Sequence, residues 1–221
     1  VKLRSLSVSD IQMIEILKAV CYDAKIIIMD EPTSAITTKE VAVLFKKIAE
    51  LKARGTSIIY ISHKMEEIFQ IADEITVFRD GKSVITKDEN LSQPGIFNNV
   101  NFNVHAGEII GFAGLMGAGR TEIMRAVFGL DPYSSGTITI KGKQVTIKNV
   151  RQAIKNGLAM LTEDRRRTGI VPILSVKYNT TLASMNKIIY RGRLHSDVEN
   201  KISSDACKSM NVKTPNLDTK I

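Results

Sequence analysis

Short apolar runs that end in polar residues mark the predicted strands of this chain. The run at 25–29 leads directly into Asp30 and Glu31, and the run at 57–62 leads into His63. Unbroken runs of this length, rich in isoleucine, are typical of strands buried on both faces of a parallel sheet. Parallel strands joined by right-handed crossovers end at the same sheet edge, so we expect these three polar residues to lie close together.

Helices are predicted between and beside these strands. Thr37–Glu40 has the form of a capping box and precedes a helical stripe that Gly55 closes. Ser9 or Asp10 is placed to cap an earlier helix, and residues 64–72 predict a third. The positions expected to face the interior are Ile11, Ile14, Ile16, Leu17 and Val20 in the first helix, Val41, Leu44, Phe45, Ile48 and Leu51 in the second, and Met65, Ile68, Phe69 and Ala72 in the third.

The alternation of strand and helix patterns continues to the end of the chain. Further strands are predicted at 74–79, 98–104, 108–113 and 158–162, and a capping box at Ser196 begins a last helix. Strands that alternate with helices indicate an α/β fold built around a parallel sheet.

A glycine-rich loop follows the predicted strand at 108–113 and precedes a helix that stops at Gly129. Glycines let successive backbone N–H groups face an anion at a helix N-terminus, so the loop is a predicted phosphate cradle. A planar arginine replaces the lysine expected there, and phosphate binding survives that change more readily than hydrolysis does. A glycine-rich turn that binds nothing is the alternative. The predicted phosphate-binding residues are Gly114, Gly117, Ala118, Gly119, Arg120 and Thr121.

The adjacent acids at the end of the first strand suit a magnesium nucleotide site. Asp30 can hold Mg²⁺ through water, while Glu31, which points the other way, can orient an attacking water. The alternative is a solvated acidic pair that caps a helix.

Composition places the chain among globular proteins. Its 221 residues are 43% hydrophobic, enough for one substantial core or two small ones, and no apolar run reaches membrane length. The N-terminus has no signal-peptide core, so we expect a cytoplasmic location. Cys21 and Cys207 have no metal or redox spacing and are expected to be free thiols.

The net charge of +8 belongs to the second half of the chain. Residues 1–94 contain 13 Lys and Arg against 14 Asp and Glu, whereas residues 95–221 contain 18 against 9. Acidic lipid headgroups, nucleotide phosphates and nucleic acid are partners that such a basic region could take. Basic strands interleaved with aromatic residues are missing from the sequence, so no nucleic acid is expected.

Three segments in this order resemble the motifs of ABC-transporter ATPases. Leu6–Met13 resembles the signature motif, Ile26–Thr33 the Walker B motif and Ile61–His63 the switch histidine. Leu-Ser-Val-Ser and Ser-His-Lys-Met-Glu-Glu-Ile-Phe are similar to the tandem ATPases of bacterial sugar importers, closest to the galactose/methyl-galactoside type. Val8 and Ser9 replace the signature glycines, and Thr37 stands where an aspartate usually closes the loop after Walker B.

The resemblance implies ATP and Mg²⁺ as cofactors and assigns roles to the motif residues. Asp30 would hold the metal, Glu31 would polarise the water and His63 would contact the γ-phosphate. The glycine-rich loop would bind a second nucleotide, with Thr121 near Mg²⁺. Ser7 and Ser9 would complete a site across an interface with a second ABC face, and Glu163 would replace the glutamine that couples nucleotide to the membrane partner.

The order of the motifs implies parts of two ABC halves. Residues 1–88 would be the C-terminal part of the first half, and 89–221 the N-terminal part of the second. The family would have a long connector where only Thr86–Pro94 stand, so the sequence is either shortened or joined across a gap. The two parts either belong to two separate P-loop domains or pack as one circularly permuted domain.

The activity implied is ATP hydrolysis by the energy-coupling subunit of a sugar importer, with galactose, methyl galactoside or a ribose-like monosaccharide as cargo. Membrane permease subunits and an upstream sugar-binding protein would be partners, and the location would be peripheral, at the cytoplasmic face of the membrane. The isolated chain is expected to hydrolyse ATP slowly or not at all. A module that binds nucleotide without hydrolysis and a translation-associated ABC protein are the alternatives.

Overall fold

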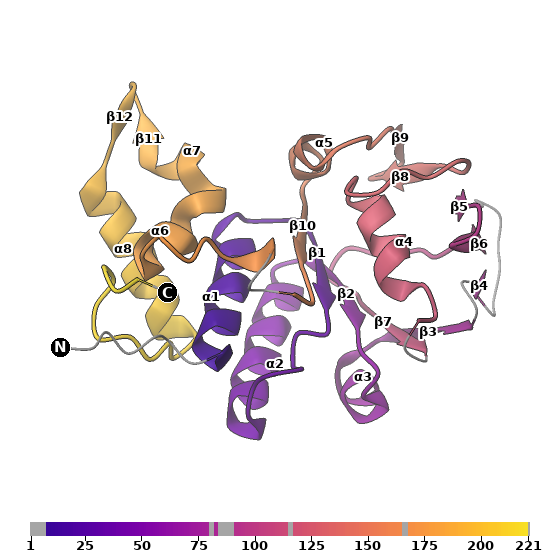
Figure 1. Ribbon diagram of the computed structural model, residues 1–221, viewed down its shortest axis with the longest axis horizontal. Helices are drawn as coiled ribbons and strands as arrows, with labels where there is room; N and C mark the ends of the chain where they lie inside the picture. The colour runs from indigo at the N-terminus through magenta and orange to yellow at the C-terminus, as the bar shows by residue number, and fades with distance from the viewer. Residues whose placement is uncertain (1–7, 80–81, 84–90, 115–116, 165–167, 221) are drawn as a thin grey trace. The chain divides into compact units, whose positions relative to one another are not determined.

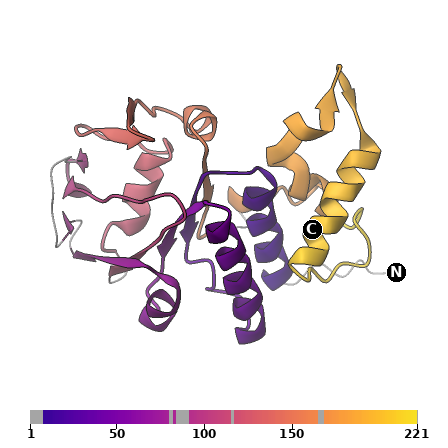
Figure 2. The same cartoon turned by 180° about the vertical axis from the view of Figure 1, so that it is seen from behind.

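The computed structural model describes residues 8–79, 82–83, 91–114, 117–164 and 168–220, which fold into two compact units. The first unit contains the segment before Ala24, Pro32–Lys47 and the chain from Leu161 onward. The second unit contains Ala24–Glu31 and Ile48–Met160. Both are visible in Figures 1 and 2, and each is described by itself below.

A six-stranded sheet is the centre of the second unit. Its order is β10-β1-β2-β7-β3-β4, in which β1, β2, β7 and β3 run parallel to one another and β4 is antiparallel to β3. β7, from the second half of the predicted division, therefore lies between β2 and β3 of the first. The strand bounds are β1 Ile26–Asp30, β2 Ser57–Ile61, β3 Glu74–Arg79, β4 Lys82–Ser83, β7 Ile109–Gly114 and β10 Leu158–Leu161.

Two helices cover opposite faces of this sheet at β7. A Cβ atom at Gly111 would lie 2.5 Å from the Ile68 side chain, so α3 (Met65–Ile71) packs directly against that face. Ile110 and Phe112 point to the other face because strand side chains alternate. There they share a buried cluster with α4 (Arg120–Val127). Figure 1 shows α4 and α3 on opposite sides of β7. Each such buried side chain contributes roughly 1.5–3 kcal/mol.

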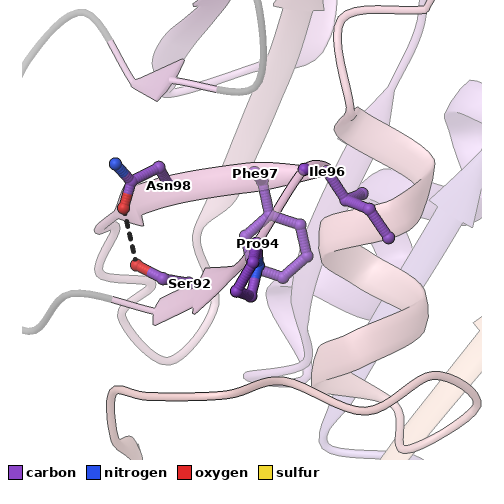
Figure 3. Close-up of a pocket in the computed structure, with 6 residues that line it drawn as sticks. Ser92, Pro94, Ile96, Phe97 and Asn98 are labelled. Atoms are coloured by element: carbon purple, nitrogen blue, oxygen red, sulfur yellow. Dashed lines mark hydrogen bonds between the residues drawn. The ribbon is translucent and has the colours of Figure 1, made fainter.

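Two hairpins and a short helix complete the second unit. β5 (Leu91–Gln93) pairs with β6 (Phe97–Val100), β8 (Ile138–Ile140) pairs with β9 (Lys143–Val145), and α5 spans Val150–Lys155. The β5–β6 turn borders an open pocket of about 440 Å³, where the Ser92 hydroxyl donates to Asn98 Oδ1 at 3.1 Å (Figure 3).

The first unit is helical. α1 (Val8–Cys21) is buried on nearly every side and packs against α6 (Val176–Thr181) and α8 (Ser196–Ser209). The first ten residues of α2 (Thr38–Ala53) belong to this unit as well. Its remaining elements are η2 Leu182–Ser184, α7 Met185–Ile188, β11 Ile189–Tyr190 and β12 Arg193–Leu194. No described helix is long and apolar enough to cross a membrane.

Several local predictions need correction. α1 begins at Val8, so Ser9 and Asp10 lie in its first turn and neither is the N-cap. Met65 and Phe69 are 38% and 68% exposed, because only Ile68 of α3 faces the sheet. The strand predicted at 98–104 spans Phe97–Val100 instead and pairs with β5.

The capping boxes and the junction also differ from expectation. At α2 the Thr37 N–H and hydroxyl both donate to Glu40 Oε2, which completes half of the predicted box. Ser196 is the first residue of α8, whose N-cap is His195. Within the junction Thr86–Pro94, residues 86–90 lie outside the described part of the chain, and β5 follows them.

Candidate functional site

Three adjacent strands of the second unit end at one edge of its sheet. Asp30 at the end of β1 is in register with Ile61 of β2, and Ile61 is in register with Phe112 of β7. Glu31 and His63 follow the first two ends, and the glycine-rich loop follows the third. In open parallel sheets this edge is where ligands bind.

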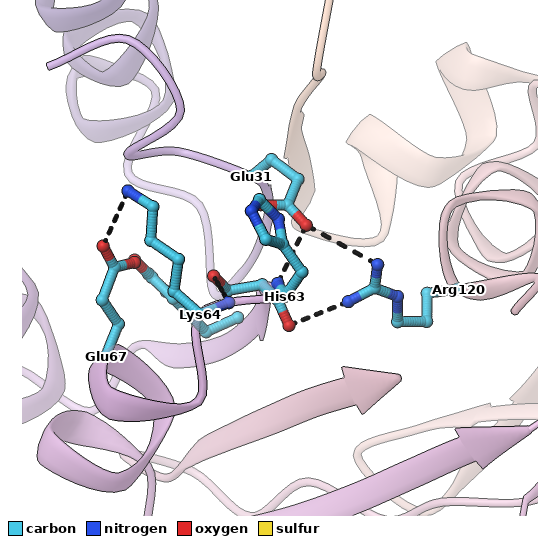
Figure 4. Close-up of polar contacts among 7 residues, drawn as sticks. Glu31, His63, Lys64, Glu67 and Arg120 are labelled. Atoms are coloured by element: carbon cyan, nitrogen blue, oxygen red, sulfur yellow. Dashed lines mark hydrogen bonds and ion pairs between the residues drawn. The ribbon is translucent and has the colours of Figure 1, made fainter. Parts of the chain in front are cut away.

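Both carboxylate oxygens of Glu31 are engaged by His63, as Figure 4 shows. Oε2 lies 2.8 Å from the imidazole Nδ1, and Oε1 accepts the His63 backbone N–H at 3.0 Å. The predicted proximity of the two residues is confirmed. The Glu31 backbone has a φ of +47°, a left-handed conformation that non-glycine residues seldom adopt, and its N–H donates to the Ile61 carbonyl. This strained backbone aims the carboxylate at His63.

Arg120 is directed at the same carboxylate. Its guanidinium donates to the Ser62 carbonyl oxygen at 2.8 Å and lies 3.6 Å from Glu31 Oε1 (Figure 4). Both side chains are more than nine-tenths buried, so each charge compensates the other in a region where an unpaired charge costs several kcal/mol. The contact with Ser62 was not predicted, because a backbone carbonyl has no signature in the sequence.

The glycine-rich loop has the backbone shape of an anion cradle. Gly117 and Gly119 have φ values of +80° and +82°, and Gly119 is the N-cap of α4 without a side-chain cap. A Cβ atom at Gly117 would meet nothing within 4 Å, so that side of the loop is open. The loop therefore leaves the first N–H groups of α4 without a capping side chain, as an anion site requires. Ala118 is buried, Gly114 ends β7, and residues 115–116 lie outside the described part of the chain.

Asp30 and Thr121 supply the oxygen atoms that magnesium prefers. Asp30 is 1% exposed at the end of β1, and Thr121 is half-buried in the first turn of α4. The pKa of Arg125 in α4 is raised, chiefly by its hydrogen bond to Asp131 and to a lesser degree by the charge of Asp30. The Asp30 carboxylate thus lies within electrostatic reach of α4.

The described residues contain no group of three or more His, Cys, Asp or Glu side chains that could hold a metal by itself. Magnesium at nucleotide sites is held by one or two protein oxygens together with phosphates and waters. A carboxylate and a hydroxyl beside a phosphate cradle fit this requirement.

Nothing in the described structure tests the roles of three further predicted site residues. Ser7 lies outside the described residues, and Ser9 is in α1, with a side chain that is not described. Glu163 is exposed and belongs to the first unit. The roles that the resemblance gives these three residues stay predictions.

Glu15 is another buried carboxylate, and no sequence motif marks it. Glu15 of α1 is 4% exposed, and its Oε1 accepts the Thr162 N–H at 3.1 Å and the Thr162 hydroxyl at 3.3 Å. Nearby, the Lys18 ammonium donates to the Gly169 carbonyl, and burial lowers the pKa of Lys18 while the charge of Glu15 raises it. These contacts tie α1 to the loop after β10. A charged residue between Ile14 and Ile16 was the available signal.

Comparison with known proteins gives a consistent family assignment. The sequence model of the family described as ABC transporter matches residues 97–213. Among curated proteins, the chain is 43% identical to a putative ribose/galactose/methyl galactoside import ATP-binding protein of Rhizobium etli, over 97% of this chain and 48% of the relative. It is 45% identical to the ribose import ATP-binding protein RbsA of Lactococcus lactis, over 95% of this chain and 50% of the relative. No solved structure matches significantly.

The chain spans about half the length of the curated relatives it matches. The Rhizobium alignment extends over 250 positions, whereas 97% of this chain is about 214 residues. About 36 aligned positions therefore have no counterpart here, and the Lactococcus alignment shows a similar excess.

Proposed function

The chain belongs to the ABC transporter family, and from that premise we propose that it is part of the ATP-binding, energy-coupling subunit of a bacterial sugar importer. The observation that carries the proposal is the junction of Glu31, His63 and Arg120 beside a glycine cradle, at the ends of three neighbouring parallel strands. This arrangement joins a phosphate-binding loop to an acid that can activate water.

Each residue has a role in the proposed site. Gly114, Gly117, Ala118 and Gly119 would cradle phosphate, while Asp30 and Thr121 would hold Mg²⁺, which neutralises developing negative charge on the phosphate oxygens when it is bound. Glu31 would orient the attacking water and His63 would contact the γ-phosphate. Ser7, Ser9 and Glu163 are proposed contacts at the second ABC face and the coupling loop.

Arg120 compensates the charge of the proposed catalytic carboxylate. Its guanidinium neutralises Glu31, and His63 engages the same carboxylate. While both oxygens of the carboxylate are engaged in this way, neither is free to accept a hydrogen bond from an attacking water. Slow turnover of the isolated chain is therefore expected.

We further propose that parts of two ABC halves, residues 1–88 and 89–221, pack as one circularly permuted domain. The insertion of β7 between β2 and β3 supports this packing, because the strand before the glycine loop then lies beside strands of the first part. The aligned positions of the relatives that have no counterpart in this chain support the loss of a connector between the two parts.

The cargo and the partners follow from the names of the relatives. Ribose, galactose and methyl galactoside appear in those names. Permease subunits and a sugar-binding protein are the partners that the family resemblance implies. We propose the same class of monosaccharide and partners for the parent protein of this chain, with a peripheral position at the cytoplasmic face of the membrane.

Steady-state phosphate release from ATP tests the enzymatic part of the proposal. We expect turnover well below the usual enzyme range of about 1–1000 per second, and we expect Glu31→Gln to abolish what remains. Glu15→Gln is the matched control, because Glu15 is equally buried but lies in the other unit. The alternative is a module that binds nucleotide without hydrolysis. It would be favoured if the chain bound ATP but Glu31→Gln left phosphate release unchanged.

A further inference from the structure

Two separate hairpins of this chain have the same type of turn. In β8–β9 the turn residues Lys141 and Gly142 have φ values of +53° and +72°. In β11–β12 the turn residues Arg191 and Gly192 have φ values of +50° and +73°. Such left-handed pairs match the twist of a two-residue hairpin loop, and a second basic residue follows the glycine in both.

The hairpins differ in what covers their apolar side chains. Ile138, Ile140 and Val145 of β8–β9 are partly buried against the core of the second unit. In the first unit, the hairpin Ile189–Leu194, here called the basic hairpin, leaves its apolar side chains in solvent. Their exposed fractions are 40% for Ile189, 49% for Tyr190 and 45% for Leu194.

The basic hairpin stands in a segment with one sign of charge. Residues 165–196 contain seven Lys and Arg and no Asp or Glu. Lys177 is paired with Asp218, and Lys187 is paired with Asp23. Arg191 and Arg193 are exposed and make no ion pair with any other described residue.

The exposed tyrosine is held in place. Its ring stacks on His195 with 3.4 Å between the centroids and 6° between the planes. Tyr190 also pairs across the hairpin with Arg193. Figure 1 shows that the hairpin projects beyond α7 and α8 of its own unit. An ordered tip of this kind can contact a flat surface with little loss of side-chain freedom.

We infer that the basic hairpin binds the surface of an anionic lipid bilayer. Arg191 and Arg193 would meet the headgroup phosphates, Tyr190 would lie at the headgroup level, and Ile189 and Leu194 would enter the acyl boundary. Each arginine near an anionic surface strengthens binding about fivefold. The hairpin shares no residue with the strand-end site, so the inference does not depend on the proposed ATPase activity.

Sedimentation with lipid vesicles tests the inference on the full 221-residue chain. We expect binding to phosphatidylglycerol/phosphatidylcholine vesicles that is lost on pure phosphatidylcholine and weakens as salt is raised. The double variant R191S/R193S should bind about 30-fold more weakly. The matched control is K141S/K143S, which removes equal charge from the other hairpin and should bind like the parent.

Three results would overturn the inference. The first is equal binding to both kinds of vesicle, or binding to neither. The second is an equal loss of vesicle affinity in the two double variants, which would indicate an effect of general basic charge. The third is binding only to vesicles that contain an importer's membrane subunits. The last result would assign the hairpin to a protein contact.

A fluorescent reporter gives a direct second readout. The chain contains no tryptophan, so a single one reports its own surroundings. We expect the emission of Tyr190→Trp to shift to shorter wavelength when anionic vesicles are added. Gln144→Trp, at an exposed position in β9 of the other hairpin, should show no shift. An unchanged Tyr190→Trp spectrum in a folded chain, checked by circular dichroism, would contradict insertion.

Discussion

Glu31 and Glu15, two of the buried glutamates of this protein, are compensated in opposite ways. Glu31 of the sheet unit is matched by charged or chargeable groups, the guanidinium of Arg120 and the imidazole of His63. Glu15 of the helical unit is bound by neutral donors of Thr162, with the buried Lys18 nearby. Ionic partners can be exchanged for a charged ligand, whereas the donors of Thr162 belong to the fold. The difference separates the proposed catalytic site from a contact that stabilises the fold.

Removing the structural glutamate should give the largest loss of stability. Glu15→Ala leaves the Thr162 N–H without its acceptor and opens a cavity beside Gly169, so the free energy of unfolding should fall by about 3 kcal/mol. Glu15→Gln keeps an acceptor oxygen and should lose about 1 kcal/mol. Urea denaturation of both variants gives these values. Nucleotide affinity should not change. A Glu15→Ala variant as stable as the parent would contradict the structural role of Glu15.

Removing Arg120, the partner of the proposed catalytic glutamate, should change both stability and ligand binding. Arg120→Ala leaves Glu31 buried with His63 alone, and His63 is half exposed, so water limits the loss to about 2 kcal/mol. Unlike Glu15→Ala, it should also weaken Mg·ATP binding about tenfold, a loss that Arg120→Lys should partly restore. Isothermal titration calorimetry measures both affinities. Unchanged ATP affinity in Arg120→Ala would mean that the loop does not use this charge.

The sequence was informative where a pattern depended on strand ends. Glu31 and His63 could be placed together because both follow buried parallel strands, and the glycine loop was recognised by its position. The direction of Arg120 could not be foreseen, since a long side chain can reach either phosphate or an acid. Phe69 is exposed because α3 is only seven residues long and rests on Gly111 through Ile68. Glu15 has no motif, and its partner lies 147 residues away.

Asp73, an exposed carboxylate, contrasts with Glu31 and Glu15, and its substitution should have the smallest effect on stability. Partial burial of Asp73 works against its charge, but hydrogen bonds from Lys52 and the Ile109 N–H lower its pKa below 3.8. Because the pKa is lower in the folded state, this contribution to stability is present above pH 3.8 and is lost as pH falls through the folded-state pKa. Asp73→Asn should therefore flatten the acid limb of the stability curve slightly. An identical acid limb in denaturation from pH 5 to 2 would contradict this.

A crystal structure of the 221-residue chain with Mg²⁺ and a non-hydrolysable ATP analogue is the most direct test of the proposed site. The account predicts one nucleotide with its phosphates on Gly117–Thr121, Mg²⁺ between Asp30 and Thr121, and Arg120 turned from Glu31 toward phosphate, all within one chain. A glycine loop without nucleotide at saturating analogue, or Glu31 and Thr121 farther apart than one nucleotide site allows, would contradict it.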